Sequence, residues 1–301
     1  SNLIKLYKMW VLFAFVSAAL LGFYDVFKKQ SLKGNAVLTV LLLNCLFSSL
    51  IFLPAIWCAP FGGWEVQKYI ILKAFIVLSS WICGYYAMKH LPLTIVGPVN
   101  ATRPMLVLLG AMLLYGESLI LFQWAGVFLA MCSFLLLKLG GKKEGIDFLH
   151  NRWIFCLFAA ALLGACSGLY DKYLMSSPAE GGLGLNRLTV QSYFNFYQLA
   201  IMLIVVMLES WKGQSENSFK WRWTIPFISL FICAADLAYF YSLSLDGAMI
   251  SVVSMVRRGS VVVSFMMGAF LFHERNLKSK AVDLVLVLLG MLCLYLGTIC
   301  S

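Results

Sequence analysis

Ten apolar runs, each about 20 residues long, constrain the fold of this chain more than any other feature of its sequence. A helix of that length crosses the hydrocarbon core of a bilayer, and the runs are continuous rather than alternating, which excludes the strands of a β-barrel. Only 12% of the residues are charged and 62% are hydrophobic, whereas a soluble domain carries about 25% charged residues. The sequence therefore predicts an all-α membrane protein with ten transmembrane helices. They are expected at Met9–Val26, Asn35–Ile56, Tyr69–Met88, Leu93–Tyr115, Leu119–Leu137, Trp153–Tyr173, Leu188–Leu208, Ile225–Leu243, Ala248–Phe272 and Ser279–Ile299.

Several motifs of the first half recur in the same order in the second half. The recurring pairs are Gly22 with Gly168, Tyr24 with Tyr170, Asp25 with Asp171, Tyr85 with Tyr239, Asn100 with Ser254, Arg103 with Arg257 and Glu117 with Glu274. We therefore expect a first five-helix repeat over residues 1–137, a polar linker over 138–152 and a second repeat over 153–301. Because five is odd, the repeats should have inverted topology around a central cavity, with a binding site near the midplane.

Three arginines, Arg103, Arg257 and Arg258, lie deep in apolar runs. A charge at the bilayer centre costs at least about 2.5–3.5 kcal/mol, so such residues pair or line a pathway. One interpretation is that Asp25 and Asp171 form structural Arg–Asp ion pairs across the repeat interface. The other is that one or more cations face a water-filled cavity.

Arg258 and Asp236 have no charged counterpart in the first half, which makes them stronger candidates for substrate binding than the matched charges. Tyrosines and small polar residues accompany them, and rings with hydroxyls suit an amphipathic ligand. The predicted substrate-binding residues are Tyr24, Tyr85, Tyr86, Asn100, Arg103, Tyr170, Asp236, Tyr239, Ser254, Arg257 and Arg258.

Several classes of protein lack support. The net charge of +10 is not gathered into a basic stripe, so nucleic acid is not an expected partner. Most of the nine cysteines lie inside apolar runs, without a CxxC or a Cys/His cluster, so neither metal nor disulfide framework is expected. No catalytic Ser/His/Asp order, HExxH or P-loop is present. We expect no enzyme, no catalytic residue and no cofactor, and transport driven by a coupling ion or an exchanged metabolite.

The chain resembles the drug/metabolite transporter superfamily, specifically its EamA-type ten-helix group. Two features carry the resemblance: the segment Leu91–Pro98 with its second copy Leu245–Ser251, and Gly116-Glu117 echoed by Glu274, where His273 replaces the expected glycine. The resemblance implies a basket-like bundle in which runs 1, 3, 4, 6, 8 and 9 line a central cavity. It also implies substrates such as amino acids, sugars, nucleotide precursors or drugs.

The predicted function is secondary active transport, by alternating access, of a small polar or amphipathic organic metabolite, either amino-acid-like or heterocyclic. If Arg258 is unpaired, transport of organic anions becomes the alternative, and a non-transporting membrane sensor is a second alternative. The expected location is the cell (inner) membrane, as a multi-pass protein in contact with the lipid bilayer. Orientation stays open: most gap cations lie opposite the termini, which favours external termini, whereas the resemblance implies cytoplasmic termini.

Overall fold

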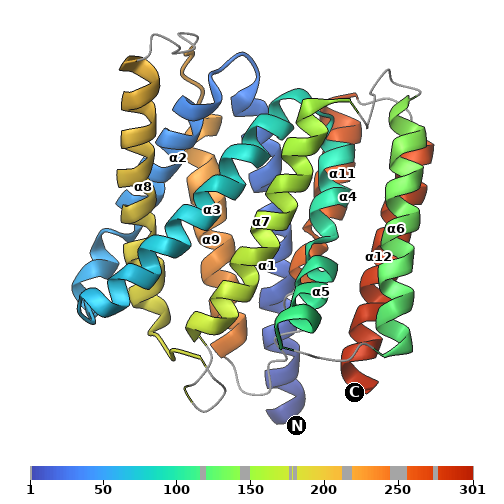
Figure 1. Ribbon diagram of the computed structural model, residues 1–301, viewed down its shortest axis with the longest axis horizontal. Helices are drawn as coiled ribbons and strands as arrows, with labels where there is room; N and C mark the ends of the chain where they lie inside the picture. Colours follow the sequence, from blue (N-terminus) through green and yellow to red (C-terminus); the bar gives the residue numbers. More distant parts are fainter. Residues whose placement is uncertain are drawn as a thin grey trace.

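The structure is a bundle of helices whose two termini lie at the same end (Figure 1). The computed structural model describes residues 2–115, 120–142, 150–175, 178, 182–211, 219–244, 256–273 and 277–300, and every regular element in these ranges is helical. The predicted all-α class is therefore confirmed for the described chain. The elements are α1 (Asn2–Leu32), α2 (Val37–Phe52), the 3-10 helix η1 (Pro54–Cys58), α3 (Trp64–His90), α4 (Leu93–Ala101), α5 (Arg103–Tyr115), α6 (Leu121–Lys142), α7 (Arg152–Met175), α8 (Arg187–Trp211), α9 (Thr224–Ser244), α11 (Ser260–Leu271) and α12 (Leu277–Cys300).

The bundle presents large apolar side chains at its surface and buries polar ones. Leu12, Phe128 and Met207 are 58%, 65% and 67% exposed, whereas Asn44 and Gln67 are fully buried. In water this arrangement would be unfavourable, because exposed apolar area is costly and amides prefer hydration. In hydrocarbon it is favourable, since polar groups must find their partners inside the protein.

Several helices have the length and hydropathy that a bilayer requires. Among the described residues, Trp64–His90, Arg152–Asp171 and Arg187–Trp211 are long and apolar enough to cross a membrane, and Val37–Phe52, Leu121–Ser133 and Thr224–Tyr239 are shorter apolar helices. These segments coincide with predicted runs to within a few residues.

Exposed tryptophans lie at the ends of these helices. Trp57 and Trp64 flank the connection from α2 to α3 and are 90% and 74% exposed, while Trp211 and Trp223 flank the connection from α8 to α9 and are 88% and 75% exposed. The two connections lie at opposite ends of the bundle (Figure 1). Indole rings favour the boundary between hydrocarbon and water, so the two tryptophan pairs fit the two faces of a bilayer.

The fourth predicted run is broken in the middle rather than continuous. Helix α4 ends at Ala101 and α5 begins at Arg103, with the Thr102 hydroxyl donating to the Val99 carbonyl (2.7 Å). Pro104 explains the break, because proline has no N–H for the Asn100 carbonyl and its ring collides with that carbonyl in a regular helix. A discontinuous helix in a membrane requires other groups to satisfy the freed backbone.

Helices from the two halves of the chain pack against each other in pairs. Helix α1 contacts α9, α3 contacts α7, α2 contacts α8 and α6 contacts α12, and the α6–α12 pair forms one edge of the bundle (Figure 1). In the first pair Ser17 Oγ donates to the Ala235 carbonyl, and in the second Ser80 Oγ donates to the Ala160 carbonyl, both at 2.7 Å. Such bonds suit helix contacts in lipid, where small polar residues join neighbouring helices.

Two expected boundaries change. Helix α1 continues past Val26 to Leu32, because its next charged residue, Lys28, is buried and paired. Helix α6 continues to Lys142, into the segment expected to be a linker. The motif positions Gly116, Glu117, Leu245–Ser251, Ser254 and Glu274 lie outside the described residues.

Candidate functional site

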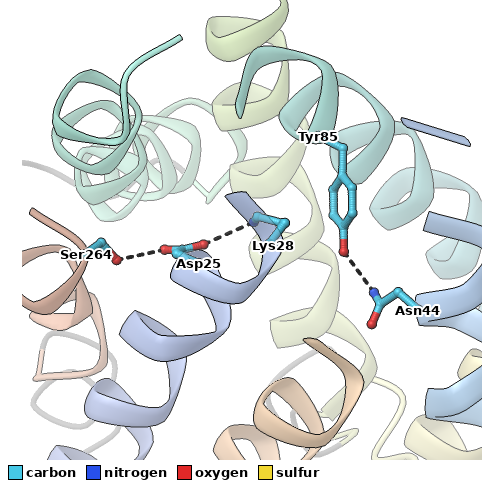
Figure 2. A network of polar contacts seen from close by, with 5 residues as sticks. All are labelled: Asp25, Lys28, Asn44, Tyr85 and Ser264. Carbon is cyan, nitrogen blue, oxygen red and sulfur yellow. Dashed lines mark hydrogen bonds and ion pairs between the residues drawn. The ribbon is translucent and has the colours of Figure 1, made fainter. Parts of the chain in front are cut away.

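A buried ion pair on α1 lies within a network of polar contacts (Figure 2). Lys28 is 8% exposed, and its Nζ lies 3.0 Å from Asp25 Oδ1. The spacing of three residues places both side chains on one face of the helix. Ser264 of α11 donates its hydroxyl proton to Asp25 Oδ2 (3.1 Å), so both carboxylate oxygens have a partner.

Two tyrosine rings surround the Lys28 ammonium. Its Nζ lies 4.3 Å from the ring centre of Tyr24 and 5.2 Å from that of Tyr85, which is 1% exposed. A cation over a desolvated ring gains about 2 kcal/mol. The Tyr85 hydroxyl accepts from Asn44 Nδ2 (3.1 Å), and Asn44 Oδ1 accepts from Ser229 Oγ (2.8 Å). The network therefore joins α11, α1, α3, α2 and α9.

A second ion pair connects α9 with the short helical segment before α11. Arg257 donates to Asp236 Oδ1, and its guanidinium lies 4.4 Å from the ring centre of Tyr239. Asp236 and Tyr239 are three residues apart on α9, so they share a face. The three residues form a unit in which the arginine has both an anionic and an aromatic partner.

Arg103 begins α5, and Arg258 directly follows Arg257 in the chain. Arg103 lies against the backbone of α7, where a Cβ at Gly164 would be 2.8 Å from its Cζ. The buried Nε of Arg103 and the buried Oδ1 of Asn100 have no hydrogen-bond partner within the described chain. The structure thus places Asp25 on α1 and Asp236 on α9, two helices that pack together, and Arg103 on α5 against α7.

Three predicted site residues lie elsewhere, where α3 meets α7. Tyr86 stacks on Trp153, and the Tyr170 hydroxyl donates to the Tyr69 carbonyl (3.1 Å). Asp171 lies 2.5 Å from Lys73 Nζ. Ser254, the remaining predicted residue, is outside the described part of the chain.

Sequence reasoning missed the lysines that pair with the repeat aspartates. Neither Lys28 nor Lys73 was among the predicted site residues, whereas both are less than a tenth exposed and pair with Asp25 and Asp171. Of the two interpretations of the buried charges, the one that pairs these aspartates with arginines does not describe them, because their ion-pair partners are lysines. Lysine suits these positions because its long apolar stem can be buried among aromatic rings. The three-residue spacing from Asp25 was the available signal for Lys28.

Other places in the described structure suit a polar ligand less well. A groove of about 380 Å³ is lined by Phe47, Leu50, Ile51, Pro226, Phe227 and Leu230. Its lining is entirely apolar, as expected for contact with lipid chains. Within the described residues no three His, Cys, Asp or Glu side chains gather where they could hold a metal ion.

Three comparisons bear on this arrangement. Residues 8–139 match the model of the EamA-like transporter family. An uncharacterized transporter of Pseudomonas aeruginosa is 32% identical over 121 residues, an alignment that covers 36% of this chain and 38% of that protein. A crystal structure of a protein 16% identical in sequence matches with a TM-score of 0.63, over 98% of this chain and 99% of the other. At that identity the last likeness concerns the fold alone.

Proposed function

Because this chain, through residues 8–139, is an EamA-type member of the drug/metabolite transporter superfamily, we propose that it is a secondary transporter of a small organic metabolite. The observation that carries the proposal is the presence of two ion pairs inside an apolar bundle: Lys28 with Asp25 on α1, and Arg257 with Asp236 of α9, the helix on which α1 packs. Charges inside a membrane protein are costly and mark substrate or ion pathways. The substrate is polar or amphipathic, and alternating access moves it at the expense of an ion gradient or of exchange.

We further propose that ten spans form two inverted repeats. Support comes from Ser49 of α2 and Asn195 of α8, which are 146 residues apart, the offset that separates the Gly-x-Tyr-Asp motifs. Ser49 Oγ donates to the Asn195 carbonyl (3.0 Å) and to the Cys45 carbonyl (2.8 Å), while Asn195 Nδ2 donates to the Gln191 carbonyl (3.0 Å). Equivalent residues meet each other where a pseudo-twofold axis passes between two helices.

The contact between α6 and α12 supports the same axis. An offset of 157 residues equates Ser133 with Gly290 and Gly126 with Asp283. Ser133 Oγ donates to Asp283 Oδ1 (2.5 Å), and a Cβ at Gly290 would lie 3.1 Å from the Gly126 carbonyl. The contact of Ser133 with Asp283 therefore corresponds to the contact of Gly290 with Gly126. This correspondence is expected if the halves are related by a twofold axis in the membrane plane.

The transport proposal is tested with the purified full chain in liposomes. The vesicles are loaded with a defined mixture of amino acids, nucleobases, sugars and carboxylic acids, and the external medium is followed by mass spectrometry. We expect at least one metabolite to leave faster than from protein-free vesicles, and the Arg257→Gln variant to slow that efflux at least tenfold. Equal efflux with and without folded protein would contradict transport and favour a membrane sensor.

We propose cytoplasmic termini in the cell (inner) membrane, although the cation distribution favours the opposite. Lys28, Lys73 and Lys280 are buried and can be left out of the count of gap cations on the two sides of the membrane. The remaining cations are still in excess on the side opposite the termini. The test is Lys142→Cys, at the end of α6, in a variant with all native cysteines replaced. In intact cells an impermeant maleimide should label this engineered cysteine from outside. Protection of the engineered position, together with labelling in a Ser1→Cys variant, would reverse the orientation.

A further inference from the structure

The start of α9 is joined to the end of α1 by hydrogen bonds on both sides of Arg222. Asn35, between α1 and α2, accepts from the Lys220 backbone N–H (2.7 Å) and donates to the Lys220 carbonyl (3.0 Å). The Ser31 hydroxyl, in the last turn of α1, bonds the Thr224 hydroxyl (2.6 Å). These contacts hold the connection from α8 to α9 against the connection from α1 to α2, at one end of the bundle (Figure 1).

Three cations are gathered where these two connections meet. Lys33 lies in the first hydrogen-bonded segment, residues 31–35, and Lys220 and Arg222 lie in the second, residues 220–224. The two lysines are exposed and the arginine is partly buried. Neither segment contains an acid. The two segments therefore present three positive charges at the surface without an anion of their own.

The apolar groove between α2 and α9 begins directly beside these cations. Pro226 and Phe227, in the first turn of α9, line the groove and follow Arg222 by four and five residues. The Trp221 ring makes an edge contact with the ring of Phe47, which lines the α2 side of the groove (centroids 6.4 Å apart). The charged segments and the groove therefore form one continuous surface.

Exposed tryptophans place the cations at the boundary between hydrocarbon and water. Trp221 and Trp223 are 48% and 75% exposed, and their ring centres are 6.0 Å apart. Indole rings favour this boundary. The groove continues from there along the apolar faces of the helices, where Leu50 and Leu230 are about half exposed. The cations thus lie at the level of lipid headgroups and the groove at the level of acyl chains.

We propose that this surface binds an anionic phospholipid, with its phosphate among Lys33, Lys220 and Arg222 and an acyl chain in the groove. An apolar lining around about 380 Å³ suits a hydrocarbon chain, and clustered Lys and Arg at the membrane surface attract anionic headgroups. In a zwitterionic lipid the ammonium group already balances the phosphate, and a soluble phosphate would leave the groove empty. The lipid site shares no residue with the buried ion pairs and is independent of the proposed transport.

The test measures the unfolding midpoint of the delipidated full chain in detergent with added lipids of identical acyl chains. Palmitoyl-oleoyl phosphatidylglycerol supplies an anionic headgroup, the matching phosphatidylcholine supplies a zwitterionic one, and glycerol phosphate is a headgroup without chains. We expect phosphatidylglycerol to raise the midpoint more than phosphatidylcholine does, and glycerol phosphate to have no effect. High salt should reduce the difference between the two lipids, because exposed charges are screened.

Variants separate the charges from the groove. Each cation near an anionic lipid surface contributes about fivefold to binding. Lys33→Gln, Lys220→Gln and Arg222→Gln should each weaken phosphatidylglycerol affinity by about that factor, and the triple variant by about a hundredfold. Arg187→Gln removes an exposed arginine at the other end of the bundle and should leave the affinity unchanged. Leu230→Trp keeps every charge but fills the groove, and should weaken binding of both lipids.

Native mass spectrometry counts the lipids that stay on the folded protein, so a variant with a lowered lipid-free midpoint still reports binding. The lipid site is wrong if phosphatidylcholine stabilises the wild type as well as phosphatidylglycerol does, or if the triple variant keeps the wild-type affinity. An equal loss in Arg187→Gln would show that only net charge matters, and would overturn the site. Stabilisation by glycerol phosphate alone would also overturn it, in favour of a site for free anions.

Discussion

The two copies of the Gly-x-Tyr-Asp motif occupy different environments. In the first copy Tyr24 is 7% exposed and the Asp25 carboxylate binds Lys28 of its own helix and Ser264 of α11. In the second copy the Asp171 side chain is 39% exposed and binds Lys73 of α3. The same four-residue pattern therefore lies in a buried charge network in one half and in a more exposed helix contact in the other. The two copies share their sequence pattern, whereas the surrounding residues determine the chemistry of each copy.

The largest expected effect comes from removing the lysine of each pair. Lys28→Met keeps an apolar stem between the tyrosine rings but leaves the Asp25 carboxylate, whose side chain is 19% exposed, without its cation, which should cost about 3 kcal/mol. Lys73→Met should cost about 1 kcal/mol, because solvent can reach Asp171. Thermal unfolding in detergent measures both. Adding Asp25→Asn should recover much of the loss in Lys28→Met, and equal losses in the two single variants would contradict the difference between the halves.

A smaller effect, opposite in sign between the halves, is expected at the motif glycines. A Cβ at Gly22 would lie 2.4 Å from Val263 Cβ and 3.2 Å from the Ser260 carbonyl, whereas at Gly168 the nearest atom, Val107 Cγ2, is 3.5 Å away. Gly22→Ala should therefore cost about 1–3 kcal/mol through overpacking. Gly168→Ala should gain about 0.5–1 kcal/mol, because alanine favours the helix. The unfolding midpoints of the two variants should move in opposite directions, and a loss at Gly168 would show that α7 packs more tightly than described.

Hydropathy located the helices well because bilayer thickness sets a minimum apolar length that any such chain must meet. Hydropathy could not locate the end of α1, because a charged residue inside a helix is taken for the start of a polar connection when its partner is unknown. Lys28 is the example: its pairing with Asp25 and its position between two tyrosine rings depend on α3, which is distant in sequence. In the sequence, the only sign of the helix break at Thr102 was the group of prolines in the fourth apolar run.

The pairing of charges was less predictable than their burial. Repeat symmetry suggested equivalent Arg–Asp pairs, but Arg103 and Arg257 differ in their surroundings, with Arg103 against Gly164 and Arg257 bonded to Asp236. Which acid reaches which cation depends on helix rotation and rotamer, and neither follows from the order of residues along the chain. Asn44 and Ser264 were missed because single polar residues in apolar runs are common helix-contact residues.

The smallest expected effects, and the only equal ones, concern the serines that join the halves. Ser17 Oγ bonds the Ala235 carbonyl between α1 and α9, and Ser80 Oγ bonds the Ala160 carbonyl between α3 and α7, each at 2.7 Å and with both serines buried. Each Ser→Ala variant loses one inter-helix hydrogen bond, worth about 0.6 kcal/mol in a membrane protein. Ser17 and Ser80 are not equivalent positions, but the helix pairs that they join, α1 with α9 and α3 with α7, correspond in the proposed repeat. Measured by thermal unfolding, Ser17→Ala and Ser80→Ala should therefore lower stability by similar small amounts, and the double variant by their sum, because the two sites share no partner. A markedly larger loss at one serine would mean that the asymmetry of the charge network extends into the helix contacts themselves.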